Sequence, residues 1–224
     1  MEEKKNKKKK KKMSAWYQFP IKEGEIWHYY DSNLKGDSMI SVCDIRHDYP
    51  TYCKKAEMVY CDPPWNKALT NYFINKACKE NKIKDYADFY MSLFERINET
   101  NAQVCYLEIG KQYVDVFEFE MGKLFPIVDV WEITYYKERK AYLLRGAYDL
   151  CKKDFSGLDD SMTPYHAIGY EILSPIVDMC MGRGLTALAC YNQCKCFYGV
   201  DINKNSLAHA ISKLNKEGAK FKVS

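Results

Sequence analysis

The chain has 224 residues, of which 47% are hydrophobic and 15% aromatic, a composition that suits one globular domain with a buried core. No apolar run approaches the roughly 18 residues needed to span a bilayer, and no apolar stretch typical of a secretory signal follows the lysine-rich start. Ten cysteines without a framework spacing argue against a disulfide scaffold. They indicate free thiols in a reducing compartment, so we expect a cytoplasmic protein.

The positive charge is concentrated at the start of the chain. The formal net charge is +4, but residues 1–12 hold eight lysines against two glutamates, so the rest of the chain is −2. We therefore expect residues 1–13 to form a disordered basic tail and residues 14–224 to form a single domain. The tail is either a solubilising arm or a flexible polycation that attracts nucleic acid non-specifically.

The predicted elements alternate between strands and helices along the chain. Apolar runs and spacings predict these elements in chain order: a strand in 39–48 ending at Asp44, a strand in 57–66 ending at Cys61, helices in 67–78 and 85–100, a strand at 102–110, a helix at 112–125, an antiparallel strand pair at 127–136 and 141–148, irregular chain at 149–163, a helix at 165–173, a strand in 175–184 running into a glycine turn, a helix at 185–194, a strand in 195–203, and a closing helix at 205–216. This order predicts an α/β fold with a mostly parallel sheet, one antiparallel hairpin, and helices on both faces.

The stretch VYCDPPWN, residues 59–66, places an acid, two prolines and a tryptophan directly behind a short apolar run. Two adjacent prolines cannot continue a strand ladder, because neither has a backbone donor. The strand is therefore expected to stop at Cys61, with Asp62–Trp65 forming a rigid lip at its carboxyl end. Ligands of open α/β sheets bind in the crevice beyond such ends.

A second signal lies near the end of the chain, in IVDMCMGRG. A strand there delivers Asp178, Gly182 and Gly184 permit a tight turn, and the next helix offers free N–H groups. Asp201 ends the following strand, where an acid can accept hydrogen bonds from both hydroxyls of a ribose. No phosphate-binding GxxxxGK[ST] is present, and Asp178 would repel a phosphate but suit a cation. S-adenosylmethionine (SAM) has a ribose, an ammonium group and no phosphate.

Together, DPPW followed by DxCxGxG and GVDIN resembles the amino-methyltransferases that act on exocyclic nitrogens of nucleic-acid bases. The order, with the catalytic motif first, resembles the circularly permuted β class of DNA methyltransferases over roughly residues 38–215. The resemblance implies a Rossmann-like SAM-dependent methyltransferase fold, circularly permuted, with ISVCDIRHDYP facing the adenine of the cofactor. It also implies the cofactor-binding set Cys43, Asp44, Asp178, Cys180, Gly182, Gly184, Asp201 and Ile202.

The predicted catalytic residues are Asp62, Pro63, Pro64 and Trp65. The lone pair of an exocyclic amine is delocalised into the ring. Two acceptors on its hydrogens, the Asp62 carboxylate and the Pro63 carbonyl, would localise it for direct methyl transfer. Trp65 offers an aromatic face to a base that is flipped out of its helix or already unpaired. In the pattern of the family, an acid at the first position favours N6 of adenine over N4 of cytosine.

Residues 137–153 carry six basic residues against Glu138 and Asp149, where the family places its target-recognition region. We predict a short target-recognition insert at 137–163. Its expected phosphate contacts are Lys137, Arg139, Lys140 and Arg145. An ordinary solvated hairpin is the alternative, and stacking of Tyr135 and Tyr136 on bases is left open. No metal site is predicted, because Cys190, Cys194 and Cys196 lack the paired spacing typical of zinc ligands.

The sequence therefore predicts a SAM-dependent DNA adenine-N6 methyltransferase, of the kind found in restriction–modification systems. Three alternatives stay open: an RNA adenine methyltransferase, a DNA cytosine-N4 methyltransferase, and a non-catalytic partner subunit that keeps the fold. Because the predicted insert is short, a second copy of the chain or a specificity subunit is a candidate partner.

Overall fold

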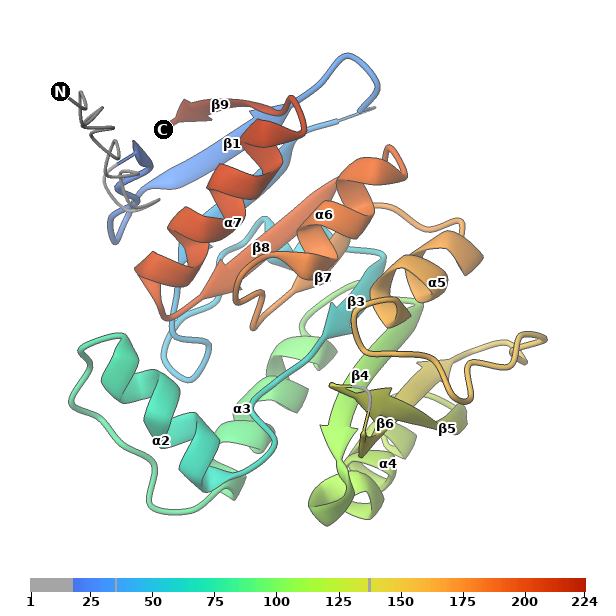
Figure 1. The fold of residues 1–224 in the computed structure, drawn as a ribbon. Coiled ribbons are helices and arrows are strands. Elements are labelled where there is room, and N and C mark those ends of the chain that lie inside the picture. Colours follow the sequence, from blue (N-terminus) through green and yellow to red (C-terminus); the bar gives the residue numbers. More distant parts are fainter. Residues whose placement is uncertain (1–17, 35, 137) are drawn as a thin grey trace, which may run out of the picture.

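The computed structural model describes residues 18–34, 36–136 and 138–224 (Figure 1). The predicted basic tail, residues 1–13, and the predicted contact residue Lys137 lie outside the described residues. The strands of the described part are β1 (Ile26–Tyr30), β2 (Ser38–Val42), β3 (Met58–Cys61), β4 (Val104–Gly110), β5 (Ile127–Tyr135), β6 (Arg139–Ala147), β7 (Ile176–Asp178), β8 (Phe197–Asp201) and β9 (Lys220–Val223). The helices are α2 (Lys67–Lys76), α3 (Ala87–Asn98), α4 (Val114–Gly122), α5 (Thr163–Tyr170), α6 (Leu185–Asn192) and α7 (Lys204–Lys216), with short 3-10 turns η1 (Cys53–Lys55) and η2 (Lys111–Tyr113).

All of these strands join one sheet in the order β5-β6-β4-β3-β7-β8-β2-β1-β9. The five central strands, β4 to β2, pair in parallel. The β5–β6 hairpin on one side and β1–β9 on the other pair antiparallel. The prediction of a mostly parallel sheet was therefore wrong, because the sheet is mixed. Short connections account for the antiparallel pairs β5–β6 and β1–β2, whereas β9 reaches the antiparallel edge from the far end of the described chain.

Helices cover both faces of the sheet, as predicted (Figure 1). Side chains of β3 alternate between the two resulting cores, with Val59 and Cys61 in one and Met58 and Tyr60 in the other. The first core is completed by α2, α3 and α4, and the second by α5, α6 and α7. Within the described ranges, none of the helices has the length and apolarity that crossing a bilayer requires.

Local sequence sets the ends of the elements around the carboxyl edge of the parallel strands. β3 ends at Cys61, as expected from the two prolines that follow. The Asn66 side chain then accepts a hydrogen bond from the Leu69 N–H and begins α2, an ordinary N-cap. The helix at 205–216 does not close the chain, because it is followed by β9, a short edge strand that pairs with β1.

Candidate active site

The predicted catalytic lip and the predicted glycine turn line one cavity of about 470 Å³, a size typical of small-molecule sites. The register explains the convergence, since β3 and β7 are neighbours whose carboxyl ends point the same way. The predicted residues that line the cavity are Cys43, Asp44, Asp62, Pro63, Pro64, Trp65, Arg139, Asp178, Cys180, Gly182, Asp201 and Ile202. Gly184 lies just behind this wall, where α6 begins.

The glycine turn holds its two acids through backbone N–H groups. Gly182 has φ +49° and Gly184 has φ +74°, a left-handed conformation that favours glycine. The Gly182 N–H donates to Asp201 Oδ2 at 2.9 Å, and the Cys180 N–H donates to Asp178 Oδ1 at 3.0 Å. A Cβ on Gly184 would stand 2.6 Å from the Ala210 Cβ, whereas one on Gly182 would make only an ordinary van der Waals contact, 3.8 Å from the Cys180 carbonyl oxygen. Gly184 is thus required by helix packing, and Gly182 by the turn that faces the cavity.

Both acids of the turn are harder to ionise than usual. Burial raises the pKa of Asp178 to about 7, opposed by hydrogen bonds from Thr186 and the Cys180 N–H. Burial also raises the pKa of Asp201 to about 6, opposed by the N–H groups of Asn203 and Gly182. A cation in the cavity would favour the charged form of both carboxyls.

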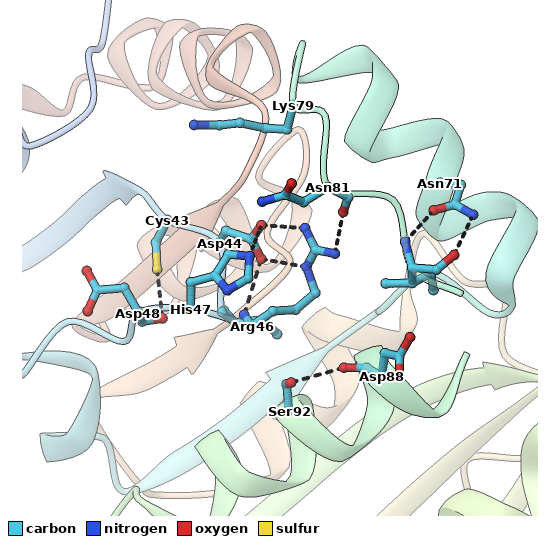
Figure 2. A network of polar contacts seen from close by, with 12 residues as sticks. Cys43, Asp44, Arg46, His47, Asp48, Asn71, Lys79, Asn81, Asp88 and Ser92 are labelled. Carbon is cyan, nitrogen blue, oxygen red and sulfur yellow. Dashed lines mark hydrogen bonds and ion pairs between the residues drawn. The ribbon is translucent and has the colours of Figure 1, made fainter. Parts of the chain in front are cut away.

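Asp44 is already engaged by a neighbour two residues along the chain (Figure 2). The Arg46 guanidinium donates from Nε to Asp44 Oδ1 at 2.9 Å and from Nη2 to Oδ2 at 2.6 Å. Its Nη1 donates to the Asn81 carbonyl at 2.8 Å, which ties the loop after α2 to this end of the cavity. Cys43 lies beside it, and its thiol donates to the Asp48 carbonyl. Asp44 therefore reaches the cavity as a charge-neutralised pair rather than as a free carboxylate.

The predicted catalytic lip is held by side chains rather than by backbone donors. The Trp65 indole N–H donates to Asp62 Oδ1 at 2.9 Å. The indole packs against Gly110, where an added Cβ would stand 2.7 Å from Trp65 Cε3. The Tyr135 ring lies 4.6 Å away, centroid to centroid. Trp65 is thus a hydrogen-bond donor to the acid as well as an aromatic wall.

The two proline carbonyls of the lip differ in their surroundings. The Tyr86 hydroxyl donates to the Pro64 carbonyl at 2.6 Å and fixes the lip from below. Within the described part of the chain, no donor reaches the Pro63 carbonyl, so it can accept a hydrogen bond from a ligand.

The Asp62 carboxyl lines the cavity, and its side chain is exposed to solvent although protein surrounds it. The surrounding protein raises its pKa, the Trp65 N–H lowers it, and the charge of Asp178 raises it further. Water still reaches the carboxyl in the open cavity. A ligand that expels this water would strengthen the shift.

Sequence reasoning missed a second acid at this end, Glu108 on β4. Glu108 is 1% exposed and lines the cavity. The buried Tyr60 hydroxyl donates to its Oε1. Asp160, from the segment predicted as irregular chain, also lines the cavity and accepts a hydrogen bond from the Tyr136 N–H. The one usable signal was an acid inside the otherwise apolar run VCYLEIG.

Three of the four predicted phosphate contacts can be placed. Arg139 is exposed at the rim of the cavity, and Lys140 is exposed and pairs with Glu132 at 2.9 Å. Arg145 is a correction, because its side chain is fully buried and forms ion pairs with the following carboxylates: Asp129, Asp149 and Glu171. A guanidinium in these contacts is not available to a phosphate. Within the predicted insert, Arg139–Ala147 form β6, a strand of the sheet.

Comparison with known proteins was informative only at the level of structure. No protein-family model matches the chain, and no curated protein sequence matches it. The structure of M1.HpyAVI is 16% identical with a TM-score of 0.52, covering 78% of this chain and 97% of that one. Its SAM complex is 15% identical with a TM-score of 0.52, covering 79% and 98%. The SAM complex of TTHA0409 from Thermus thermophilus, a candidate DNA modification methylase, is 12% identical with a TM-score of 0.54, covering 80% and 93%. At these identities the likeness shows the fold alone: the chain shares the α/β architecture of these structures.

Proposed function

We propose that this protein transfers a methyl group from SAM to N6 of adenine in DNA, with the base flipped into the cavity beside DPPW. The observation that carries the proposal is that an acid–Pro–Pro–Trp lip and a Gly-x-Gly turn, over a hundred positions apart, line one cavity. SAM complexes among the structural neighbours add support. The order of the two motifs supports assignment to the circularly permuted β class.

The residues at the turn end fit SAM. Asp201 retains lone pairs for the two ribose hydroxyls, since each of its oxygens accepts only one backbone hydrogen bond. Asp178 suits the ammonium group, and Gly182 lines the cavity without a side chain that would fill it. Cys43, Asp44 and Ile202 line the region proposed for the cofactor's adenine. When bound, the cofactor supplies an electrophilic methyl group on a positively charged sulfonium.

The lip residues prepare the amine for attack. The Asp62 carboxylate and the Pro63 carbonyl accept its two hydrogens, which favours a pyramidal nitrogen with a localised lone pair. The Trp65 N–H holds one oxygen of Asp62 in place, so the acceptor is oriented before the base arrives. Asp62, or water beyond it, takes up the proton that the methylated nitrogen releases. No covalent bond between protein and base is required.

The aromatic groups at the lip support a base as the substrate. Trp65, Tyr135 and Tyr136 form a chain of rings, with successive centroids 4.6 and 4.4 Å apart. A flipped base gains about 1–3 kcal/mol from stacking on one aromatic ring, comparable to the few kcal/mol that unstacking costs. Arg139, exposed at the cavity rim, is the proposed phosphate contact that remains.

The proposal is tested by transfer of radiolabelled methyl from SAM to unmethylated DNA and to RNA, each with the wild type and with Asp62→Ala. We expect label in DNA adenine with the wild type and none with the variant. Label in RNA alone would move the proposal to the RNA alternative, and label in cytosine to the N4 alternative. SAM binding without transfer to any nucleic acid would favour a non-catalytic partner subunit.

A further inference from the structure

The cavity is lined by two carboxyl groups, those of Asp62 and Glu108, at the same height along neighbouring strands. Strand β3 pairs with β4 so that Cys61 stands opposite Leu107, and the next residues along are Asp62 and Glu108. Both line the cavity. Asp62 comes from the lip and Glu108 from the strand beside it, so two carboxyls face the space proposed for the target base.

The hydrogen bonds of Glu108 leave one oxygen for a ligand. Tyr60 donates its hydroxyl hydrogen to Oε1, and Tyr60 itself is buried. Among the described residues, the Tyr60 hydroxyl is the one group that forms a hydrogen bond with the Glu108 side chain, and it does so at Oε1. Oε2 therefore has no protein partner there. A buried carboxyl with one oxygen already accepting a hydrogen bond will carry any proton on the other.

The surroundings of Glu108 favour that proton. Burial raises the pKa of Glu108 well above its usual value, and the charges of Asp62, Asp160 and Asp178 raise it further, while the Tyr60 hydroxyl opposes them. No lysine or arginine forms an ion pair with Glu108 within the described part of the chain. Two level carboxyls in one cavity are a familiar means of keeping one of them neutral near pH 7.

A neutral acid beside a charged one matches the outer Watson–Crick edge of adenine and cytosine. On that edge each of these bases presents an exocyclic amine, which donates, next to a ring nitrogen, which accepts. Guanine and thymine present the reverse order, an oxygen that accepts next to a ring N–H that donates. A pocket with an acceptor at Asp62 and a donor beside it therefore fits the first pair and repels the second.

We propose that Glu108 donates a hydrogen bond from its protonated Oε2 to the ring nitrogen beside the target amine, N1 of adenine, while Asp62 accepts from the amine. The proposal deepens the function proposed above and rests on it. It assigns Glu108 as a base-reading residue in contact with the substrate and Tyr60 as a positioning residue that fixes which oxygen carries the proton. It gives the pocket a means of rejecting guanine and thymine that requires no contact outside the cavity.

The first experiment needs no activity. Infrared difference spectroscopy of Glu108→Gln against the wild type at pH 7 should show a band of a protonated carboxyl that is lost in the variant. The matched control, Glu118→Gln, changes an exposed acid of α4 outside the cavity and should lose only carboxylate absorption. Loss of a carboxylate band, rather than a protonated one, in Glu108→Gln would overturn the proposal.

The second experiment uses an oligonucleotide that the wild type methylates, made with adenine or with 1-deazaadenine at the target. Replacing N1 by CH removes the acceptor and should lower kcat/KM of the wild type about ten- to hundredfold, because a buried donor loses its partner. Glu108→Leu should lose as much on adenine and show no further loss on 1-deazaadenine. Glu108→Gln, whose amide still donates, should recover most of the activity that Glu108→Leu loses.

Binding of the same two oligonucleotides, measured without cofactor, should follow the same pattern. Thermal unfolding of each variant shows whether it folds, and if Glu108→Leu does not, the deaza comparison in the wild type and Glu108→Gln decides alone. Equal kcat/KM for adenine and 1-deazaadenine in the wild type would refute the role of Glu108 while leaving methyl transfer standing. Absence of methyl transfer to any base would instead refute the proposed function. The infrared measurement would then still test whether the Glu108 carboxyl is protonated.

Discussion

The two ends of the cavity hold their carboxyl groups in different ways. At the glycine turn, backbone N–H groups donate to Asp178 and Asp201. At the lip, side chains donate instead, from Trp65 to Asp62 and from Tyr60 to Glu108. The turn end is therefore set by backbone conformation and suits a ligand of fixed shape. The lip end is set by replaceable side chains, so its chemistry can be changed with little effect on the fold.

The largest expected effect comes from removing the negative charge of Asp62, which should affect the lip end of the cavity and not the turn end. Asp62→Asn keeps the size of the side chain but removes the charged acceptor from the amine. We expect kcat to fall on the order of 10²–10³-fold, while the dissociation constant of SAM changes less than about threefold. Single-turnover kinetics and titration calorimetry measure the two quantities. Asp115→Asn, an exposed acid of α4, is the control, and a comparable loss there would show that the effect is not local to the lip.

The opposite pattern is expected at the turn end. Asp201→Ala removes the acceptor for both ribose hydroxyls, so we expect SAM affinity to fall roughly 100-fold at an unchanged single-turnover rate under saturating SAM. The variant also leaves the Gly182 N–H without its partner. If SAM affinity were unchanged, the ribose would have to lie elsewhere.

Packing of the lip is tested by Gly110→Ala. The new Cβ would stand 2.7 Å from Trp65 Cε3, so the indole must shift and its hydrogen bond to Asp62 must lengthen. We expect kcat to fall about tenfold with SAM affinity retained, since misplacement of a catalytic group by an ångström costs rate. Gly122→Ala is the matched control, because no atom lies within 4 Å of its added Cβ.

The pH dependence of stability should report the buried acid of the turn. The pKa of Asp178 rises from 3.8 to about 7 on folding, so between these values the folded protein retains a proton that the unfolded chain has lost. Its contribution is therefore fully present below about pH 4 and is lost as pH rises toward 7, by up to about 1.4 kcal/mol per pH unit. In denaturant titrations from about pH 5 to 7, Asp178→Asn should lessen this decline. A decline equal to that of the wild type would contradict the assignment.

The smallest expected effect is on DNA binding, from substitution of Arg139 at the rim of the cavity. Arg139→Ala should weaken DNA binding a few-fold and lower the salt dependence of binding by about one ion, without changing stability. Arg145→Leu should instead destabilise the protein, because it leaves the largely buried Glu171 carboxylate without its ion-pair partner. A salt-dependence change in Arg145→Leu, with stability intact, would restore the original prediction for that residue.

Local pattern was sufficient to predict most elements and both motifs. Two prolines ended β3, and Gly182 and Gly184 marked a turn, because proline and glycine act on the backbone at their own positions. Partners distant in sequence could not be predicted. The carboxylates around Arg145 come from β5, the segment after β6 and the residue after α5, so a basic residue expected at the surface proved to be buried.

The missed features share a cause. β1 and β9 are short, and KFKV alternates lysine with apolar residues, as an edge strand does. Glu108 was not predicted as a site residue, because a single acid in an apolar strand does not show which residues of the neighbouring strand lie beside it. The partner of Asp44, by contrast, stands two residues away and could have been found, since Asp-x-Arg is a local pair.

The central claim is that the lip and the turn serve one reaction. A crystal structure with S-adenosylhomocysteine tests it most directly. The account predicts the ribose hydroxyls on Asp201, the amino-acid end near Asp178, and the sulfur facing Asp62 across the cavity. A ligand bound outside this cavity, or with its sulfur turned away from Asp62, would contradict the account.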